Sequence, residues 1–167
     1  MRVLILCEHD GKGIRLGSRS AVTFANAVAE ETQGSVECLV LGHAVGAVAQ
    51  DAAGYAPVLV SDHPALANPV ADRYAKIIAD VVKQRSYDLV VAAATTFAKD
   101  ILPRAAGLLG GAMASEVIGH QFREGRLCFR RPLFAGAVVA TVALKRSPQI
   151  VTVRPSAYVP ANALAER

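Results

Sequence analysis

Short apolar runs alternate with helical patterns up to Gly110, and this alternation constrains the possible folds more than any other feature. The runs occupy residues 2–7, 36–42, 56–61 and 88–94 and consist mainly of aliphatic residues. Continuous apolar runs of this length are typical of strands that are covered on both faces, as parallel strands are. Regular alternation of strand and helix therefore predicts an α/β fold with a parallel core.

Helical spacing fills the gaps between the runs. Apolar residues recur at i, i+3, i+4 and i+7 within residues 21–28, so we expect a helix there with Ser18 or Ser20 as its N-cap residue. A shorter helix is predicted over residues 44–53. The clearest apolar stripe, over residues 70–81, predicts a third helix.

The pattern changes after Gly111. Residues 113–144 show no helical period, and Glu124-Gly125 separates two strand-like runs, which predicts an antiparallel hairpin. A further strand is expected over residues 150–155. We therefore predict a mostly parallel sheet with antiparallel strands added late in the chain.

Length and composition favour a single folded domain. The chain has 167 residues, of which 53% are hydrophobic and 19% charged, so disorder is excluded. We place the domain at residues 1–158 and interpret residues 159–167, which have no evident partner element, as the start of an inter-domain linker or a disordered tail. No apolar run approaches the roughly 20 residues that a membrane span needs. The first residues are typical of a strand rather than of a signal peptide.

The three cysteines predict buried free thiols. Cys7, Cys38 and Cys128 lie far apart in apolar runs, and no C-x-x-C pair occurs. This cysteine usage favours a cytoplasmic or similarly reducing compartment.

Positive charge is concentrated in the last part of the chain. Residues 1–120 hold 10 Lys and Arg against 12 Asp and Glu, whereas residues 121–167 hold 8 against 2. Such a surface suits an acidic partner, a phosphorylated ligand or nucleic acid. Because aromatic residues for base stacking are sparse, we predict a partner-facing or solvated surface and no nucleic-acid binding.

Three glycines near the start raise the question of a phosphate-binding loop. Gly11, Gly13 and Gly17 read G-x-G-x-x-x-G, one residue too long for the dinucleotide fingerprint, and the helical stripe begins only at Ala21. A phosphate cradle needs its glycines where the strand meets the helix N-terminus. We therefore predict a turn, in which Asp10-Gly11 and Gly13 supply positive φ angles.

Three histidines offer a second possible site. His9, His43 and His63 each follow one of the first three predicted strands, so a parallel sheet would bring them to its carboxyl edge. With Glu8 and Asp62 beside them, they could hold a metal ion. Solvated loop histidines are the favoured interpretation, and no metal ligand is predicted.

Thr95 and Thr96 are the candidate ligand-binding residues. They follow the fourth predicted strand and can cap the next helix, whose free amides, with Lys99 and Arg104 nearby, suit an adenylate or another anion. The alternative is a purely structural cap. Pro103 should kink this helix or make it restart.

The basic segment contributes arginines but no catalytic motif. Arg130, Arg131 and Arg154 lie beside prolines in predicted strands, where they suit carboxylates, phosphates or an acidic partner, or simply solubilise an exposed face. The sequence contains no G-x-S-x-G or H-E-x-x-H motif. We predict no catalytic residues.

The segments "ATTFAKDILPRAAGLLG", "RPLFAGAVVATV" and "IVTVRPSAY" strongly resemble the N-terminal domain of the electron transfer flavoprotein alpha subunit. The resemblance covers nearly the whole chain in order and is most specific over residues 95–109 and 131–155. It implies a Rossmann-like three-layer sandwich of the adenine nucleotide alpha-hydrolase type. It also implies electron transport by a heterodimer of alpha and beta subunits, which carries one FAD and accepts electrons from dehydrogenases.

The chain departs from this family in two ways. Most FAD contacts of the family come from a second, C-terminal alpha domain that nothing here resembles, so we expect no tightly bound FAD on this chain alone. The chain would then be truncated, a fragment of a longer gene or a split subunit. Ala98 also stands where the family often has glycine, and Ala137 where it has asparagine, so no polar ligand contact is expected at residue 137.

Two functions follow from these observations. The favoured one is a docking domain that pairs with the beta subunit through the basic last part of the chain and "LFAGAVVATV". The alternative is an autonomous adenine-nucleotide-binding module of the universal stress protein type, with the adenylate near His9, Gly42 and Thr96. The sequence assigns neither an electron donor nor an acceptor.

Overall fold

The parallel core is a six-stranded sheet with the strand order β3-β2-β1-β4-β9-β5, in which every neighbouring pair is parallel. The computed structural model describes residues 1–163. The strands of this sheet are β1 (Arg2–Leu6), β2 (Ser35–Gly42), β3 (Val58–Asp62), β4 (Leu89–Ala93), β5 (Ala112–Val117) and β9 (Gln149–Val153). The predicted α/β fold with a parallel core is therefore confirmed.

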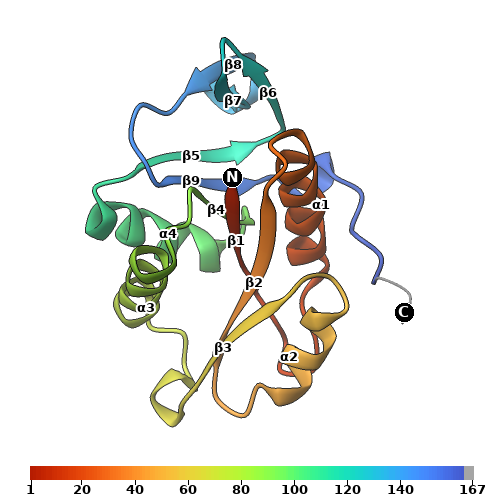
Figure 1. Ribbon diagram of the computed structural model, residues 1–167, viewed down its shortest axis with the longest axis vertical. Helices are drawn as coiled ribbons and strands as arrows, with labels where there is room; N and C mark the ends of the chain where they lie inside the picture. Colours follow the sequence, from red (N-terminus) through yellow and green to blue (C-terminus); the bar gives the residue numbers. More distant parts are fainter. Residues whose placement is uncertain (164–167) are drawn as a thin grey trace.

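Helices cover both faces of this sheet. They are α1 (Leu16–Glu31), α2 (Gly46–Ala53), α3 (Ala71–Arg85) and α4 (Thr96–Leu109). Along β1, Val3 and Ile5 join the core under α1 and α2, whereas Leu4 and Leu6 join the core under α3 and α4. Figure 1 shows the two helix pairs on opposite sides of the sheet, which is the predicted three-layer sandwich.

The late antiparallel strands are also confirmed, but they form a sheet of their own. Its order is β6-β7-β8, with β6 (Gly119–Arg123), β7 (Arg126–Leu133) and β8 (Val138–Ala143). Glu124 and Gly125, with φ angles of 50° and 73°, form the predicted hairpin turn, as the right-handed twist of the strands favours. Strands β5 and β9 instead extend the parallel sheet. This three-stranded sheet lies beyond β5 in Figure 1.

One face of the three-stranded sheet packs on α1. Leu127 and Phe129 of β7 are buried in the same core as Phe24 of α1. His120 of β6 meets the Phe24 ring edge-on, with 5.3 Å between ring centroids. Tyr158 meets it in a similar geometry at 5.5 Å. The buried Phe24 ring thus contacts both the second sheet and the segment that follows β9.

The start of α1 differs from the prediction. The helix begins at Leu16, and its N-cap residue, Arg15, makes no side-chain capping bond. Ser18 lies inside the helix, where its hydroxyl accepts a hydrogen bond from the Glu8 amide at 2.9 Å and donates one to the Glu8 carbonyl at 3.0 Å. The prediction of Ser18 or Ser20 as the N-cap was wrong because the helix starts earlier and Ser18 binds the segment that follows β1 instead of capping its own helix.

Helix α4 continues through Pro103 to Leu109, so of the two predicted effects of this proline the restart was wrong, and the kink stays a prediction. Both Pro103 and Lys99, whose carbonyl loses its helical donor, are exposed. Water can replace that donor, which lowers the cost of a proline at this position.

The described part of the tail has a packing partner. Thr23 of α1 donates a hydrogen bond to the Val159 carbonyl at 2.6 Å, and the Ala161 amide donates to the Arg19 carbonyl at 3.1 Å. Residues 159–161 therefore lie against α1, although the sequence showed no partner for them. The boundary at residue 158 stays a prediction, and residues 164–167 lie outside the described chain.

The cysteines agree with the prediction. Cys7, Cys38 and Cys128 are free and buried. The neighbouring Cys38 side chain, together with burial, raises the pKa of the Cys7 thiol well above its ordinary value. Among residues 1–163, none of the helices has the length and apolar character needed to cross a bilayer.

Candidate functional site

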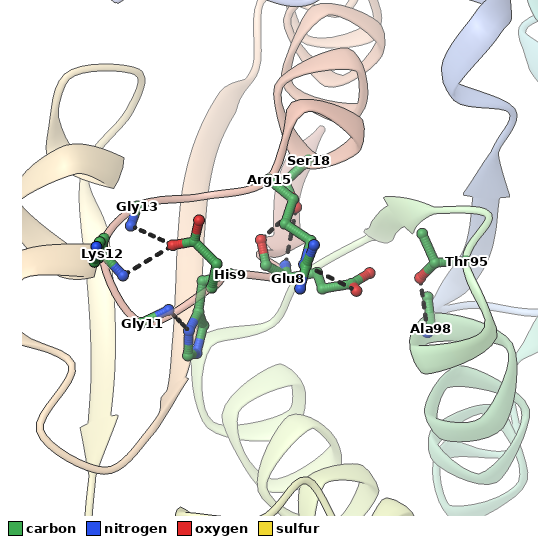
Figure 2. Close-up of polar contacts among 10 residues, drawn as sticks. Glu8, His9, Gly11, Lys12, Gly13, Arg15, Ser18, Thr95 and Ala98 are labelled. Atoms are coloured by element: carbon green, nitrogen blue, oxygen red, sulfur yellow. Dashed lines mark hydrogen bonds and ion pairs between the residues drawn. The ribbon is translucent and has the colours of Figure 1, made fainter.

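The strand order places a possible binding site at the carboxyl ends of β1 and β4. The chain runs from β1 through β2 to β3 on one side and then returns to β4 on the other side of β1. Ligands of open α/β sheets bind at such a switch point, between the loops that follow the two central strands. Here those loops lead to α1 and α4 (Figure 2).

The loop after β1 satisfies its own backbone donors. The Asp10 carboxylate accepts hydrogen bonds from the amides of Lys12 and Gly13 at 2.9 and 3.1 Å, and these bonds hold the pKa of Asp10 below its ordinary value. The amide of Ile14 donates to Asp51 at 2.8 Å, and that of Arg15 to the Glu8 carbonyl at 2.8 Å. These contacts form a closed turn (Figure 2).

The remaining amides of the loop are also used. The Asp10 amide donates to the Gly13 carbonyl at 3.2 Å, and the Gly11 amide to Nδ1 of His9 at 3.3 Å. Every amide from residue 10 to residue 15 therefore has a protein acceptor, whereas a phosphate cradle requires free N–H groups. Gly11 has the predicted positive φ, at 90°. The predicted turn is confirmed, although Gly13 has no positive φ and instead leaves room for Asp51, whose Oδ2 would lie 2.8 Å from a Cβ at that position.

Two of the three histidines contact the backbone, and the third lies beside a carboxylate. Nε2 of His9 lies 2.9 Å from the Leu41 carbonyl, and Nδ1 of His63 accepts from the Ala65 amide at 3.1 Å. His43 lies 3.6 Å from the Asp62 carboxylate. Across residues 1–163 no three His, Cys, Asp or Glu side chains are grouped as metal ligands would be. The possible metal site therefore has no support in the described chain.

Thr95 caps α4, as predicted. Its hydroxyl accepts a hydrogen bond from the Ala98 amide at 3.3 Å (Figure 2). Thr96 is the first residue of the helix and is exposed. One of the free amides of this helix end is thus occupied by the chain itself.

The cations predicted near Thr95 are engaged by carboxylates. Lys99 forms an ion pair with Glu116, whose other oxygen accepts from Nε of Arg154 at 3.0 Å. Partial burial opposes ionisation of Glu116, but the bonds from Lys99 and Arg154 outweigh it and lower the pKa of this carboxyl. Arg104 pairs with Asp72 at 2.8 Å and lies about 12 Å along α4 from Thr96, at 1.5 Å per residue. The structure therefore does not bring Arg104 to the helix N-terminus.

A cavity of about 530 Å³ lies at this edge of the sheet. Its size is within the range of small-molecule sites. It is lined by the loop after β1, the end of β2, the turn before α3, and the first turn of α4; the lining residues are Glu8, His9, Asp10, Gly11, Arg15, Gly42, His43, Leu66, Ala67, Pro69, Tyr74 and Phe97.

The cavity includes two of the three residues expected near an adenylate, His9 and Gly42, whereas its wall in α4 is Phe97 rather than Thr96. Glu8 and Arg15 pair at 3.4 Å at its margin. Phe97 and Tyr74 could not be predicted as lining residues, because their contribution depends on how α3 and α4 approach the sheet edge.

The three-stranded sheet carries a second candidate surface. Phe134 is 81% exposed in the β7–β8 connection, and Val138 and Val139 of β8 are 50% and 46% exposed. Arg131, predicted to bind an anion or a partner, donates to Ser115 at 3.0 Å, while Arg130 is exposed. The three predicted arginines thus differ in their roles. Arg131 and Arg154 form contacts within the domain, whereas Arg130 is exposed.

Sequence comparison relates the whole chain to one family. The electron transfer flavoprotein domain family matches residues 3–167. The chain belongs to the electron transfer flavoprotein family. It is 34% identical over 161 residues to the electron transfer flavoprotein subunit alpha of Pseudomonas aeruginosa, an alignment that covers 95% of this chain and 49% of that protein.

Other relatives in this family are alpha subunits with similar identity and coverage. The mitochondrial alpha subunit of Oryza sativa subsp. indica is 32% identical, with 98% of this chain and 46% of that protein covered. The alpha subunit of Bacillus subtilis is 30% identical, with 93% and 48% covered. The chain thus spans about half the length of the curated alpha subunits that it matches.

The two departures from the electron transfer flavoprotein motifs occupy different environments. Ala98, where the family often has glycine, is buried, and its amide serves the Thr95 cap. Ala137, where the family has asparagine, is exposed in the β7–β8 connection, and its amide donates to the Phe134 carbonyl at 3.1 Å. The first change therefore affects packing within α4, and the second makes an exposed surface less polar.

Proposed function

We propose that this chain is the docking domain of an electron transfer flavoprotein of the alpha type, which pairs with a beta subunit in FAD-dependent electron transfer. The FAD of the assembled protein would be held mainly outside this chain and would receive its electrons from dehydrogenases. The observation that carries this proposal is the edge of the three-stranded sheet formed by β8, in a chain whose relatives are alpha subunits.

The two edges of this sheet differ in charge. Strand β6 includes Arg123 and His120, whereas β8 contains no charged residue, proline or glycine. Natural proteins protect free edges with charges, prolines or bulges, because an exposed row of N–H and C=O groups can pair with another chain. An uncharged edge with half-exposed valines is suited to being covered by a partner.

The charge around β8 indicates what kind of partner would fit. Arg126, Arg130 and Lys145 make no ion pair with any described residue, and the last part of the chain is strongly basic. A second copy of this chain would bring like charges together, whereas a beta subunit with an acidic rim would complement them.

Association with the cognate beta subunit tests this proposal, measured by size-exclusion chromatography with light scattering. Val139→Lys places a charge on β8 and should weaken the complex at least about 30-fold. Val60→Lys is the matched control, because Val60 is 48% exposed in β3, itself an edge strand of the other sheet. The proposal fails when the unaltered chain does not associate, or when both variants weaken the complex equally.

An autonomous adenylate-binding module is the second candidate, and the cavity beside Phe97 and Tyr74 favours it. Calorimetric titration with AMP and ATP tests this function directly. Under the docking proposal both titrations are flat and the purified chain shows no flavin absorbance. Micromolar AMP binding that Phe97→Ala abolishes would replace the docking proposal with the nucleotide-binding one.

A further inference from the structure

The connection between β7 and β8 has an unusual backbone. Phe134, Ala135 and Gly136 have consecutive φ angles of 51°, 54° and 95°. L-residues other than Gly, Asn and Asp rarely adopt this left-handed region, and a phenylalanine there is an outlier. The connection is closed by the hydrogen bond from the Ala137 amide to the Phe134 carbonyl and by the pairing of Leu133 with Val138.

This backbone presents an aromatic ring to solvent. Phe134 is the most exposed of the large aromatic side chains, at 81%, although phenylalanine is normally buried in folded proteins. Backbone strain of this kind is found at functional sites, where the surrounding structure holds a residue in an otherwise disfavoured conformation. Here the neighbouring strands hold the strained backbone, while the Phe134 side chain stays 81% exposed.

The surroundings of Phe134 are apolar and continuous with β8. From Pro132 to Leu144 the sequence contains no charged residue, and Val138 and Val139 are half-exposed next to the tip. Basic residues border this stretch, with Arg130 and Arg131 before it and Lys145 and Arg146 after it. Of these, Arg130 is exposed and pairs with Thr141 part-way along the two strands, so a basic side chain lies beside the apolar stretch, as polar residues lie around the apolar core of protein interfaces.

We propose that Phe134 is the anchor residue of the interface with the beta subunit, held ready for insertion by the left-handed turn 134–136. This inference rests on the proposed docking function and identifies the residue that supplies most of its affinity. The partner would provide an apolar pocket for the ring and a carboxylate that faces the exposed Arg130 further along β7. Because the turn fixes the backbone under the ring in the free domain, binding requires little further ordering.

Two variants separate the ring from the backbone that presents it. Phe134→Ala removes the ring and should weaken binding to the cognate beta subunit at least about 30-fold. Ala135→Pro keeps every large apolar side chain but requires a φ near −65° at residue 135 and disfavours helical angles at Phe134. It should weaken binding at least about 10-fold, because the ring then points elsewhere.

Val159→Ala is the matched control. Val159 is also 81% exposed, but it lies in the tail beside α1, where its backbone carbonyl rather than its side chain makes the contact with Thr23. Its substitution should leave the dissociation constant unchanged. All three variants should keep the thermal unfolding temperature of the unaltered chain within about 3 °C, since the altered side chains are exposed.

Titration calorimetry with the beta subunit distinguishes the outcomes. Binding by the unaltered chain that Phe134→Ala and Ala135→Pro weaken, and Val159→Ala does not, is the expected result. Binding that Phe134→Ala leaves unchanged overturns this inference while keeping the docking function. Absence of binding by the unaltered chain overturns the docking function and the anchor with it.

Discussion

Truncation of Phe24 is the most direct test of how the second sheet is held on the domain. Its ring is fully buried between α1, β6 and β7 and contacts His120, Phe129 and Tyr158 with centroid separations of 5.3, 6.4 and 5.5 Å. We expect Phe24→Ala to destabilise the whole domain and to loosen the three-stranded sheet before the parallel one.

The expected size of the effect follows from these contacts. Burial of a phenylalanine side chain stabilises a fold by about 1.5–3 kcal/mol. Each aromatic contact adds about 0.5–1.5 kcal/mol, and the cavity left behind adds a further cost. Because measured Phe→Ala losses in cores are about 3–5 kcal/mol, we expect about 4 kcal/mol here. For a domain of this size that loss lowers the thermal midpoint by about 8–16 °C.

Urea unfolding followed by circular dichroism measures this loss, and amide hydrogen exchange locates it. Phe24→Leu, which keeps most of the volume, should lose only about 1 kcal/mol. Leu108→Ala in α4, where Leu108 is 53% exposed, should change the free energy of unfolding by less than about 0.5 kcal/mol. A loss below about 1 kcal/mol for Phe24→Ala, or exchange that is no faster in β6 and β7 than in β1, would refute the role assigned to Phe24.

Three further predictions concern local features. Asp62 accepts hydrogen bonds from the amides of Ala44 and Val45, which hold its pKa below the ordinary value. Its stabilising effect is therefore present above the ordinary aspartate pKa and is lost as the pH falls through its folded-state pKa. The difference in thermal midpoint between the parent and Asp62→Asn should shrink from pH 7 to pH 3, and a constant difference would contradict this. Gly34→Ala should destabilise the domain by more than about 1 kcal/mol, because the new Cβ would lie 1.9 Å from the Met1 carbonyl oxygen. At Gly46 no atom lies within 4 Å of such a Cβ, so Gly46→Ala should stabilise the domain by about 0.5–1 kcal/mol in urea titrations. The three buried thiols should not react with a disulfide reagent at pH 8 until urea is added, and a thiol that reacts in the folded protein would show that its strand opens.

The parallel core was predictable from the sequence because its strands are apolar on both faces. Apart from Arg2 and Asp88 at their first positions, the runs 2–7 and 88–94 contain no charged residue, so both faces must be covered and helices must lie between the strands. The antiparallel strands were also predictable, since a Glu124-Gly125 pair between two strand-like runs is typical of a hairpin turn. Their separation into a second sheet was not, because strand order depends on contacts between distant segments.

The details that sequence reasoning missed all depend on tertiary contacts. Serine is a common N-cap residue, but the Ser18 hydroxyl instead forms two hydrogen bonds with the backbone of Glu8, which follows β1. Lys99 and Arg154 were predicted to suit an anion, but both pair with Glu116. This residue has a φ of 58° and lies at the irregularity of β5 between Ala114 and Val117. Thr95 could be predicted as a cap because capping is local. Its role toward a ligand stays a prediction.

Binding at the second sheet should gain more free energy than binding at the crevice at the switch point. A phosphate entering the loop after β1 would have to replace existing hydrogen bonds of the Lys12, Gly13 and Ile14 amides, so each exchange would gain little. Insertion of the Phe134 ring into an apolar pocket breaks no such bond and gains about 1.5–3 kcal/mol from burial alone. The amides of this loop are thus committed to the fold of the domain, whereas the exposed aromatic ring and the uncharged strand edge are not. This distribution supports the proposed docking function over the binding of an anion at the switch point.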